Sequence, residues 1–346
     1  MARMSRGIAV ILILTGLGAW AGQHVMAAET TPGTPANSWR QVAAQGPAAR
    51  WGHMAVYDPD GGRVLVFGGS GQASNLGDVW EFSLKTETWR DITPKGTGPS
   101  SRFTAGAVAD PPRRRMVVVG GYTGYDSSDE VWAFSFVTNE WVRLPSGPSA
   151  RFDLAMAASP EKAWVYGGFR NFEEALGDLW ELDLRTDTWR QLPGGPPQPA
   201  PRTNLTFGFD APSNRLYLFG GHDQHPAPHA DTWAYDLTTS RWTPLLPAGT
   251  VPEAVTHQAY IFDAACRALW MMGGDRNNQR NVATTWVLNI NPLSFVRIQA
   301  AAEPPPRQHA AMAMDAGGRL ILFGGRDGEH RLLSDTWILE RTTRCP

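Results

Sequence analysis

Five arginines recur at one position of a repeated unit, and their guanidinium groups could together bind an acidic group. Each precedes a predicted strand: Arg50, Arg102, Arg151, Arg202 and Arg307. Val255 takes the matching position of the fifth unit, with Glu253 and His257 nearby. Converging guanidinium groups suit a carboxylate or an acidic peptide. Because a structural role would also repeat in each unit, the alternative is that each arginine ties loops to its own unit.

A second set of candidates follows six pairs of glycines and differs from unit to unit. Its members are Ser70, Tyr122, Phe169, His222, Asp275 and Arg326. Variation at one position of a repeat often marks function, since positions that hold the fold stay alike. We predict that five side chains join the arginines in binding a ligand on this face: Tyr122, His222, His257, Asp275 and Arg326.

The loop of the fourth unit concentrates histidine. It holds His222, His225 and His229, and His257 begins the next unit on the same face. Imidazoles grouped in this way could bind zinc or copper. The proline-rich loop has no regular ligand spacing, however. We therefore predict an exposed polar loop with no metal and no cofactor.

A repeat with a period near 50 residues must position all these side chains. An apolar run ends in Gly-Gly six times, and the first glycines lie 52, 47, 53, 53 and 51 residues apart: Gly68, Gly120, Gly167, Gly220, Gly273 and Gly324. A tryptophan follows each first glycine at 12 or 13 residues: Trp80, Trp132, Trp180, Trp233, Trp286 and Trp337. Such a period predicts a radial array of small sheets.

Each unit is predicted to form four short strands, which in the first unit are residues 51–57, 63–67, 78–84 and 88–92. The fourth strands carry an aromatic residue nine positions after the tryptophan, at Trp89, Trp141, Trp189, Trp242 and Phe295. The sixth such position would be Pro346, whereas Trp39 in residues 37–42 belongs to no preceding unit. The first strand is therefore predicted to complete the last unit and close a ring.

This unit resembles the kelch repeat. The resemblance is carried by Arg50-Trp51-Gly52-His53, Gly68-Gly69, Asp78-Val79-Trp80 and Trp89, and by their counterparts in later units. It implies an all-β fold, a six-bladed kelch-type β-propeller over residues 37–346. Kelch propellers include protein-binding modules, an oxidase and sugar-modifying enzymes, so the resemblance leaves the function open. A copper-radical oxidase is disfavoured, because it needs a cysteine beside a tyrosine at the metal and Cys266 is expected on the opposite face.

Composition and the N-terminal residues predict an exported protein. Residues 1–28 have a positive start, a short apolar core and small residues at the end, as signal peptides do, and 29–36 are predicted to be a disordered leader. In an oxidising compartment Cys266 and Cys345 would pair, although two free thiols are the alternative. A net charge of −2 gives no case for nucleic acid. We expect a periplasmic or extracellular monomer with no stable membrane insertion after cleavage.

Two functions compete at this point. The first is an exported scaffold that holds a partner protein or an acidic small ligand on a face ringed by arginines. The alternative is a periplasmic sugar-modifying enzyme resembling N-acetylneuraminate epimerase, a sialic-acid mutarotase. Such an enzyme needs an acid/base group beside carboxylate-binding arginines. No motif singles one out among the candidates Glu173, Glu174, Glu253, Asp275 and His257.

Overall fold

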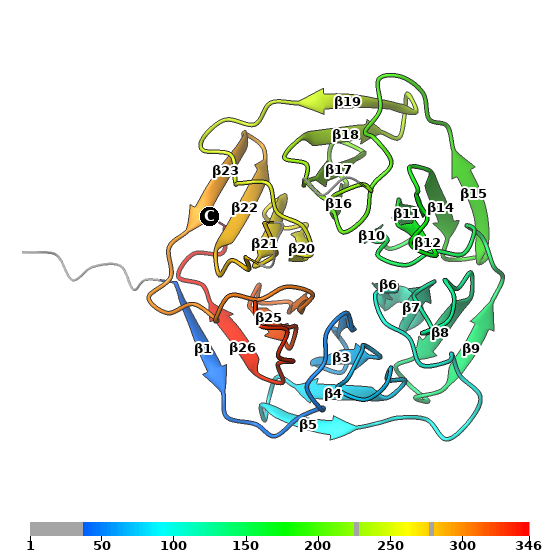
Figure 1. Ribbon diagram of the computed structural model, residues 1–346, viewed down its shortest axis with the longest axis vertical. Coiled ribbons are helices and arrows are strands. Elements are labelled where there is room, and N and C mark those ends of the chain that lie inside the picture. The colour runs from blue at the N-terminus through cyan, green and yellow to red at the C-terminus, as the bar shows by residue number, and fades with distance from the viewer. Residues whose placement is uncertain (1–36, 225–227, 277–279, 346) are drawn as a thin grey trace, which may run out of the picture. The chain divides into compact units, whose positions relative to one another are not determined.

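The computed structural model describes residues 37–224, 228–276 and 280–345. The predicted signal peptide (1–28), the predicted leader (29–36) and His225 lie outside the described residues. Within the described part, six four-stranded antiparallel sheets surround a common axis as the blades of a β-propeller (Figure 1). The predicted all-β, six-bladed fold is confirmed.

The first three blades follow one another along the chain. Blade one comprises β2 (Met54–Asp58), β3 (Arg63–Phe67), β4 (Val79–Ser83) and β5 (Thr88–Asp91). Blade two comprises β6 (Gly106–Asp110), β7 (Arg115–Val119), β8 (Val131–Ser135) and β9 (Trp141–Leu144), with a 3₁₀ turn at Pro111–Arg113. Blade three comprises β10 (Ala155–Ala158), β11 (Lys162–Tyr166), β14 (Leu179–Asp183) and β15 (Thr188–Leu192).

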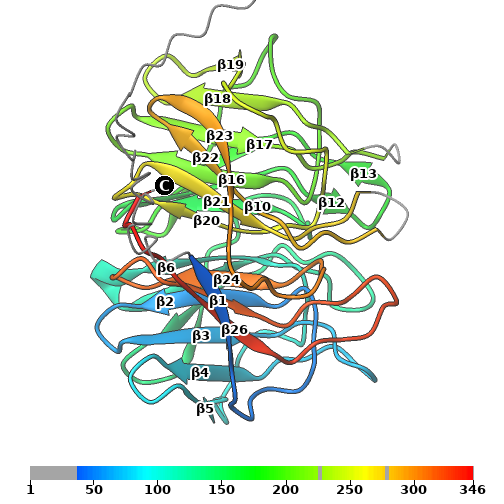
Figure 2. The same ribbon diagram turned by 90° about the vertical axis from the view of Figure 1, so that its left-hand side faces the viewer.

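The remaining blades repeat this order. Blade four comprises β16 (Thr206–Asp210), β17 (Arg215–Phe219), β18 (Thr232–Asp236) and β19 (Arg241–Leu245). Blade five comprises β20 (Ala259–Asp263), β21 (Ala268–Met272), β22 (Thr285–Ile290) and β23 (Leu293–Ile298). Blade six comprises β24 (Ala311–Met314), β25 (Leu320–Phe323), β26 (Thr336–Glu340) and β1 (Ser38–Val42). A small hairpin, β12 (Phe169–Arg170) and β13 (Glu174–Ala175), extends from blade three on the face opposite the turns that join first and second strands (Figure 2).

Burial between neighbouring blades explains why the second strands are apolar. In β7, the four residues Met116–Val119 are all buried. One apolar cluster joins Val117 of blade two to Val165 of blade three, so each blade forms a core with the next. A strand covered on both faces needs no polar alternation, which is why these segments read as continuous apolar runs.

The ring closes through the first strand, as predicted. β1 pairs antiparallel with β26, with Trp39 opposite Leu339 and Gln41 opposite Trp337. Trp39 is 1% exposed and its Nε1 donates to the hydroxyl of Thr285 in blade five at 3.3 Å. β1 therefore holds the last blade together and also packs it against the blade before.

A disulfide joins Cys266 and Cys345, with Cα atoms 5.3 Å apart. Cys266 lies in the turn between β20 and β21 of blade five, and Cys345 follows β26 of blade six. The bond thus links the two blades on either side of the β1 contact. No helix in the described residues has the length and apolar character needed to cross a membrane.

Candidate functional site

The five arginines predicted to bind a ligand are instead buried in their own blades. Their side chains are at most 1% exposed: Arg50, Arg102, Arg151, Arg202 and Arg307. Each guanidinium donates to a carboxylate of the same blade, respectively Asp78, Glu130, Asp178, Asp231 and Asp335. The prediction of an arginine-ringed ligand face was wrong in this respect, because every one of these cations already has its anion and is shielded from a ligand.

The same arginines also satisfy the backbone where the chain turns. Nη1 of Arg50 donates to the carbonyl of Gly68 at 3.0 Å, and the N–H of Gly69 donates to the carbonyl of Arg102 in the next blade at 2.9 Å. Gly68 has a φ of +67°, and a Cβ there would lie 2.6 Å from the Arg102 carbonyl oxygen. The paired glycines and the arginines therefore form one structural joint between blades, which explains why both recur.

The fifth blade lacks both partners of this joint. Val255 replaces the arginine, and Thr284 occupies the place of the acidic residue, since its carbonyl accepts from the N–H of Gly273 as that of Asp231 does from Gly220. A lone arginine here would be buried without its anion, and a lone, partly exposed carboxylate would lack its cation. The two changes therefore belong together.

A ring of backbone hydrogen bonds surrounds the axis two residues beyond the arginine position. Its members all have a left-handed φ, between +49° and +63°: Gly52, Thr104, Asp153, Asn204, His257 and His309. Five successive N–H groups donate to the carbonyl of the preceding blade's member, at 2.6 to 3.1 Å. The left-handed Gly52 also explains why the first strand begins at Met54 rather than at the predicted residue 51.

We call the polar hollow at this ring the axial mouth. The hollow beneath the ring has a volume of about 130 Å³ and is lined by the ring residues Thr104, Asp153, Asn204, His257 and His309. We include in the mouth the residues that adjoin the ring, namely Trp51, which precedes Gly52, and Tyr122, His222, Asp275 and Arg326, whose backbones each pair with the residue just before a ring member. The backbone of Arg326 pairs with that of Gln308, immediately before His309. The imidazoles of His257 and His309 lie 4.0 Å apart, and those of His222 and His257 lie 5.3 Å apart.

Several polar atoms of the mouth are buried without a hydrogen-bond partner among the described residues. They are Oγ1 of Thr104, Oδ1 of Asp153, Nδ1 of His257, Oδ1 of Asp275 and Nε of Arg326. Buried polar groups in folded proteins are nearly always paired, and exceptions cluster where a ligand or ordered water completes the network. This concentration around one axis marks the mouth as the candidate site.

Burial shifts the protonation of these groups. It raises the pKa of the Asp153 carboxyl to about 6, although the charge of Arg326 offsets part of the effect. Burial lowers the pKa of His257 and His309 well below the usual value, and the charge of Arg326 adds to this. Both imidazoles are therefore neutral near pH 7, whereas Asp153 titrates within reach of neutrality.

An aromatic wall borders the mouth on the side of blades one to three. The ring of Trp51 lies 4.8 Å from that of Phe103, Tyr122 lies 5.3 Å from Phe152, and the 61% exposed Phe172 lies 5.0 Å from Tyr122. The guanidinium carbon of Arg326 lies 4.5 Å from the centre of the Trp51 ring. The wall offers apolar contact beside a cation, which suits a ligand with both kinds of group.

Five of the predicted site residues lie at the mouth, and three of the predicted acid/base candidates lie outside it. Tyr122, His222, His257, Asp275 and Arg326 come together there. The acid/base candidates Glu173, Glu174 and Glu253 are exposed, and the last two pair with Arg170 and Arg276. In the described part of the chain no group of three or more His, Cys, Asp or Glu side chains is arranged to hold a metal ion.

Sequence reasoning missed Asp153, Asn204, His309 and Trp51. All but the tryptophan stand two residues after the arginine position, as does His257, and Trp51 stands one residue after it. This constant offset was a usable signal. The arginines suggested a binding site because they are charged, but the residues that form the site are the variable ones two positions further along the chain.

These features define a class of protein: a six-bladed β-propeller in which β1 completes the last blade, with a polar mouth on its axis. The sequence matches the family model of the KLHDC2/KLHL20/DRC7 Kelch-repeats domain over residues 31–209 and 193–345. The chain belongs to the kelch-repeat family, which confirms the resemblance seen in the sequence.

Its similarity to curated relatives is distant. The chain is 25% identical to acyl-CoA-binding domain-containing protein 5 of Arabidopsis thaliana, over 85% of this chain and 47% of the relative. It is 27% identical to kelch domain-containing protein 10 of Xenopus tropicalis, over 73% and 63%. It is 26% identical to the Rab9 effector protein with kelch motifs of Xenopus laevis, over 55% and 54%. The chain thus spans about half to two thirds of these relatives.

Proposed function

We propose that the protein is an exported binding scaffold that holds a partner protein, or an acidic small ligand, at the axial mouth. Arg326 carries the proposal. Its Nε is buried with no hydrogen-bond partner among the described residues, and its guanidinium lies over Trp51. An unpaired guanidinium can receive a carboxylate while an apolar group of the same partner packs on the aromatic wall. The binding face is assigned to the mouth because the five repeated arginines are occupied.

The carboxylates of the mouth set the pH at which such a partner binds best. Asp153 and Asp275 both interact electrostatically with Arg326 and would repel an incoming anion. Asp153 loses its charge below its pKa of about 6. Binding of an acidic partner should therefore strengthen as the pH falls through 6. The Asp153→Asn variant should lose this dependence.

Selection from a random displayed peptide library tests the proposal without a known partner. Peptides recovered on the whole protein should be enriched in Asp and Glu and should bind the Arg326→Met variant at least about tenfold more weakly, since hydrogen bonds to charged groups contribute about 1.5–3 kcal/mol. Arg331→Met is the matched control, because Arg331 lies in the same loop with its side chain 70% exposed. Peptides without acidic residues, or equal binding to both variants, would contradict it.

Export is the second part of the proposal. Residues 1–28 have the composition of a signal peptide, and a disulfide between Cys266 and Cys345 suits an oxidising compartment. Expression of the full chain in a Gram-negative host, followed by fractionation and mass spectrometry, should find a periplasmic protein that starts near residue 29. A cytoplasmic protein that retains Met1 would contradict export.

One observation favours the sugar-modifying enzyme as a second candidate. The Asp153 carboxyl, with a pKa of about 6, lines the same hollow as the neutral imidazoles of His257 and His309 and interacts electrostatically with Arg326, as an acid/base group near a carboxylate-binding cation would. Proton NMR of sialic-acid anomers should then show faster interconversion with the protein, and the acceleration should be lost in Asp153→Asn. A rate equal to that in buffer would remove this candidate.

A further inference from the structure

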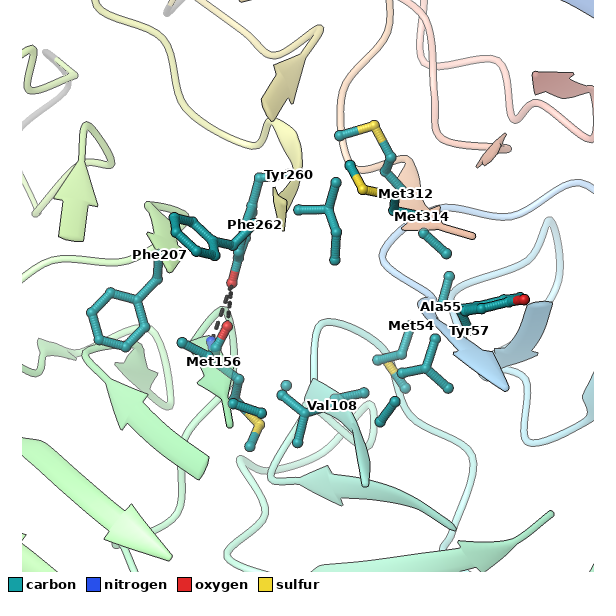
Figure 3. Close-up of a pocket in the computed structure, with 18 of the residues that line it drawn as sticks. Met54, Ala55, Tyr57, Val108, Met156, Phe207, Tyr260, Phe262, Met312 and Met314 are labelled. Atoms are coloured by element: carbon teal, nitrogen blue, oxygen red, sulfur yellow. Dashed lines mark hydrogen bonds between the residues drawn. The ribbon is translucent and has the colours of Figure 1, made fainter. Parts of the chain in front are cut away.

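A second, larger cavity lies along the propeller axis below the axial mouth (Figure 3). It has a volume of about 500 Å³ and is lined by the first strands of the blades. Small side chains widen it on blades one and two, where Ala55, Ala107 and Ala109 line it. It reaches the turns between first and second strands, where Pro111 and Pro160 line it. The volume is within the usual range for small-molecule sites.

Tyr260 lies where this cavity meets the mouth. Its hydroxyl accepts a hydrogen bond from the N–H of Met156 at 3.1 Å and donates to the Met156 carbonyl at 3.4 Å, so the side chain reaches from blade five to blade three (Figure 3). Tyr260 lines both hollows. The two hollows share this part of their lining, but the cavity continues along the first strands to Pro111 and Pro160, which do not line the mouth.

The lining of the cavity is uncharged and mostly apolar. Among the described residues that line the cavity there is no Asp, Glu, Lys or Arg. The imidazole of His53 at its upper end is held neutral, because burial and the charge of Arg50 lower its pKa to about 3. Met54, Met156, Met312 and Met314 line the wall, and their flexible thioethers adapt to a flexible guest.

We propose that this cavity binds an uncharged small molecule with an alkyl chain, which enters from the end where the strand-one to strand-two turns lie. The mostly apolar wall offers water few hydrogen-bond partners, and an alkyl chain gains free energy by burial against it. An ionised group has no counter-charge there and would be excluded. The guest is therefore distinct in chemistry from the acidic partner of the mouth.

Carbon-13 NMR of the methionine methyl groups tests the proposal on the unaltered protein, with decan-1-ol as the probe. Saturable shifts are expected at Met54, Met156, Met312 and Met314. Met116, Met271 and Met272, which are buried but do not line the cavity, are the internal controls. Assignment uses single Met→Leu variants. No saturable shift, or shifts of equal size at the control methionines, would overturn the proposal.

Chain length and charge provide a second measurement. Octan-1-ol should bind about tenfold more weakly than decan-1-ol, because each buried methylene contributes about 0.8 kcal/mol. Decane-1,10-diamine, which has the same chain but two positive charges, should not compete. Equal binding of the diamine would overturn the proposal, since it would show that the site does not select against charge.

A space-filling variant locates the guest independently. Ala107 lies in the middle of β6 and lines the cavity. It is half-buried, whereas its neighbours Gly106 and Val108 are buried. Ala107→Phe should weaken decan-1-ol binding at least tenfold, and Ala301→Phe, at an exposed position, should not. Undiminished binding by a folded Ala107→Phe variant would overturn the assignment, and the methionine measurement decides the matter should that variant fail to fold.

Discussion

Arg202 donates two hydrogen bonds to the carboxylate of Asp231, from Nη1 to Oδ1 at 2.5 Å and from Nη2 to Oδ2 at 3.0 Å. The arginine is 1% exposed, and the same carboxylate accepts from Nε1 of Trp233 at 2.6 Å. Four other blades repeat this joint, and blade five dispenses with it by replacing both members with Val255 and Thr284. Blade five therefore provides a natural design for removing the pair.

The first prediction copies blade five into blade four. Arg202→Val should lower the free energy of unfolding by about 1–3 kcal/mol, because it leaves the Gly220 carbonyl and the partly exposed Asp231 carboxylate without their donor. Arg202→Val combined with Asp231→Thr should recover at least about 1 kcal/mol of that loss. Urea unfolding of the two single variants and the double variant gives the coupling. Additive losses would show that the two residues do not act as a unit.

The arginines also show which parts of the structure could be predicted from the sequence and which could not. Periodicity alone predicted the number of blades, the strand order and the closure by Trp39, because each repeat of the Gly-Gly and tryptophan spacing corresponds to one blade. It did not tell whether a repeated arginine points to the axis or into its own blade. The deciding partner was visible in the motif itself, since each arginine precedes its carboxylate by 27 to 29 residues.

The candidate site was predictable only in part. His222, Asp275 and Arg326 were found because they vary at a fixed position, and the structure brings them to the mouth. Asp153 and His309 were missed, because their approach to the axis depends on a left-handed backbone ring that forms only when the blades assemble. Their raised or lowered pKa values likewise come from burial that no local pattern reveals.

The second prediction concerns Asp153. Its pKa is about 6 in the folded protein, against an ordinary value of 3.8, so the folded state holds this proton more tightly between those values. Its contribution to stability is therefore present below about pH 4 and lost as the pH rises to 6. Asp153→Asn should be more stable than the wild type at pH 7.5 by roughly 1–3 kcal/mol, and the difference should shrink at pH 4.

Urea unfolding at the two pH values measures this effect. Asp129→Asn is a suitable control, because Asp129 is exposed on the same propeller. The control should change the free energy of unfolding little at either pH. An Asp153→Asn variant that shows the same stability difference from the wild type at pH 4 and pH 7.5 would refute the burial of an ionisable carboxyl at the mouth.

The third prediction concerns His53, whose contribution to stability depends on pH in the opposite direction from that of Asp153. Its pKa falls from 6.5 to about 3 through burial and the charge of Arg50, and His257 and His309 shift in the same direction. These histidines favour the folded state above pH 6.5, and their contribution is lost as the pH falls toward 3. His53→Met, which cannot become charged, should lose less stability than the wild type between pH 6.5 and 4.5.

Thermal unfolding across this pH range measures how steeply the stability of the wild type and of His53→Met changes with pH. His330→Asn serves as the control, since His330 is exposed and asparagine tolerates its left-handed φ of 61°. The control should keep the wild-type slope. Equal slopes in His53→Met and the wild type would mean that His53 does not resist protonation in the folded state.

The fourth prediction concerns the disulfide that joins blades five and six. The bond closes a stretch of 79 residues between Cys266 and Cys345 and, like the contact of Trp39 with Thr285, it links blades five and six. Cross-linking so long a segment restricts the unfolded chain more than the folded one. Cys266→Ser combined with Cys345→Ser should therefore lower the free energy of unfolding by about 2–4 kcal/mol. The wild type under a reducing agent should match the double variant, because both lack the same cross-link. If neither loses stability relative to the oxidised wild type, ring closure rests on β1 alone and the bond adds nothing to it.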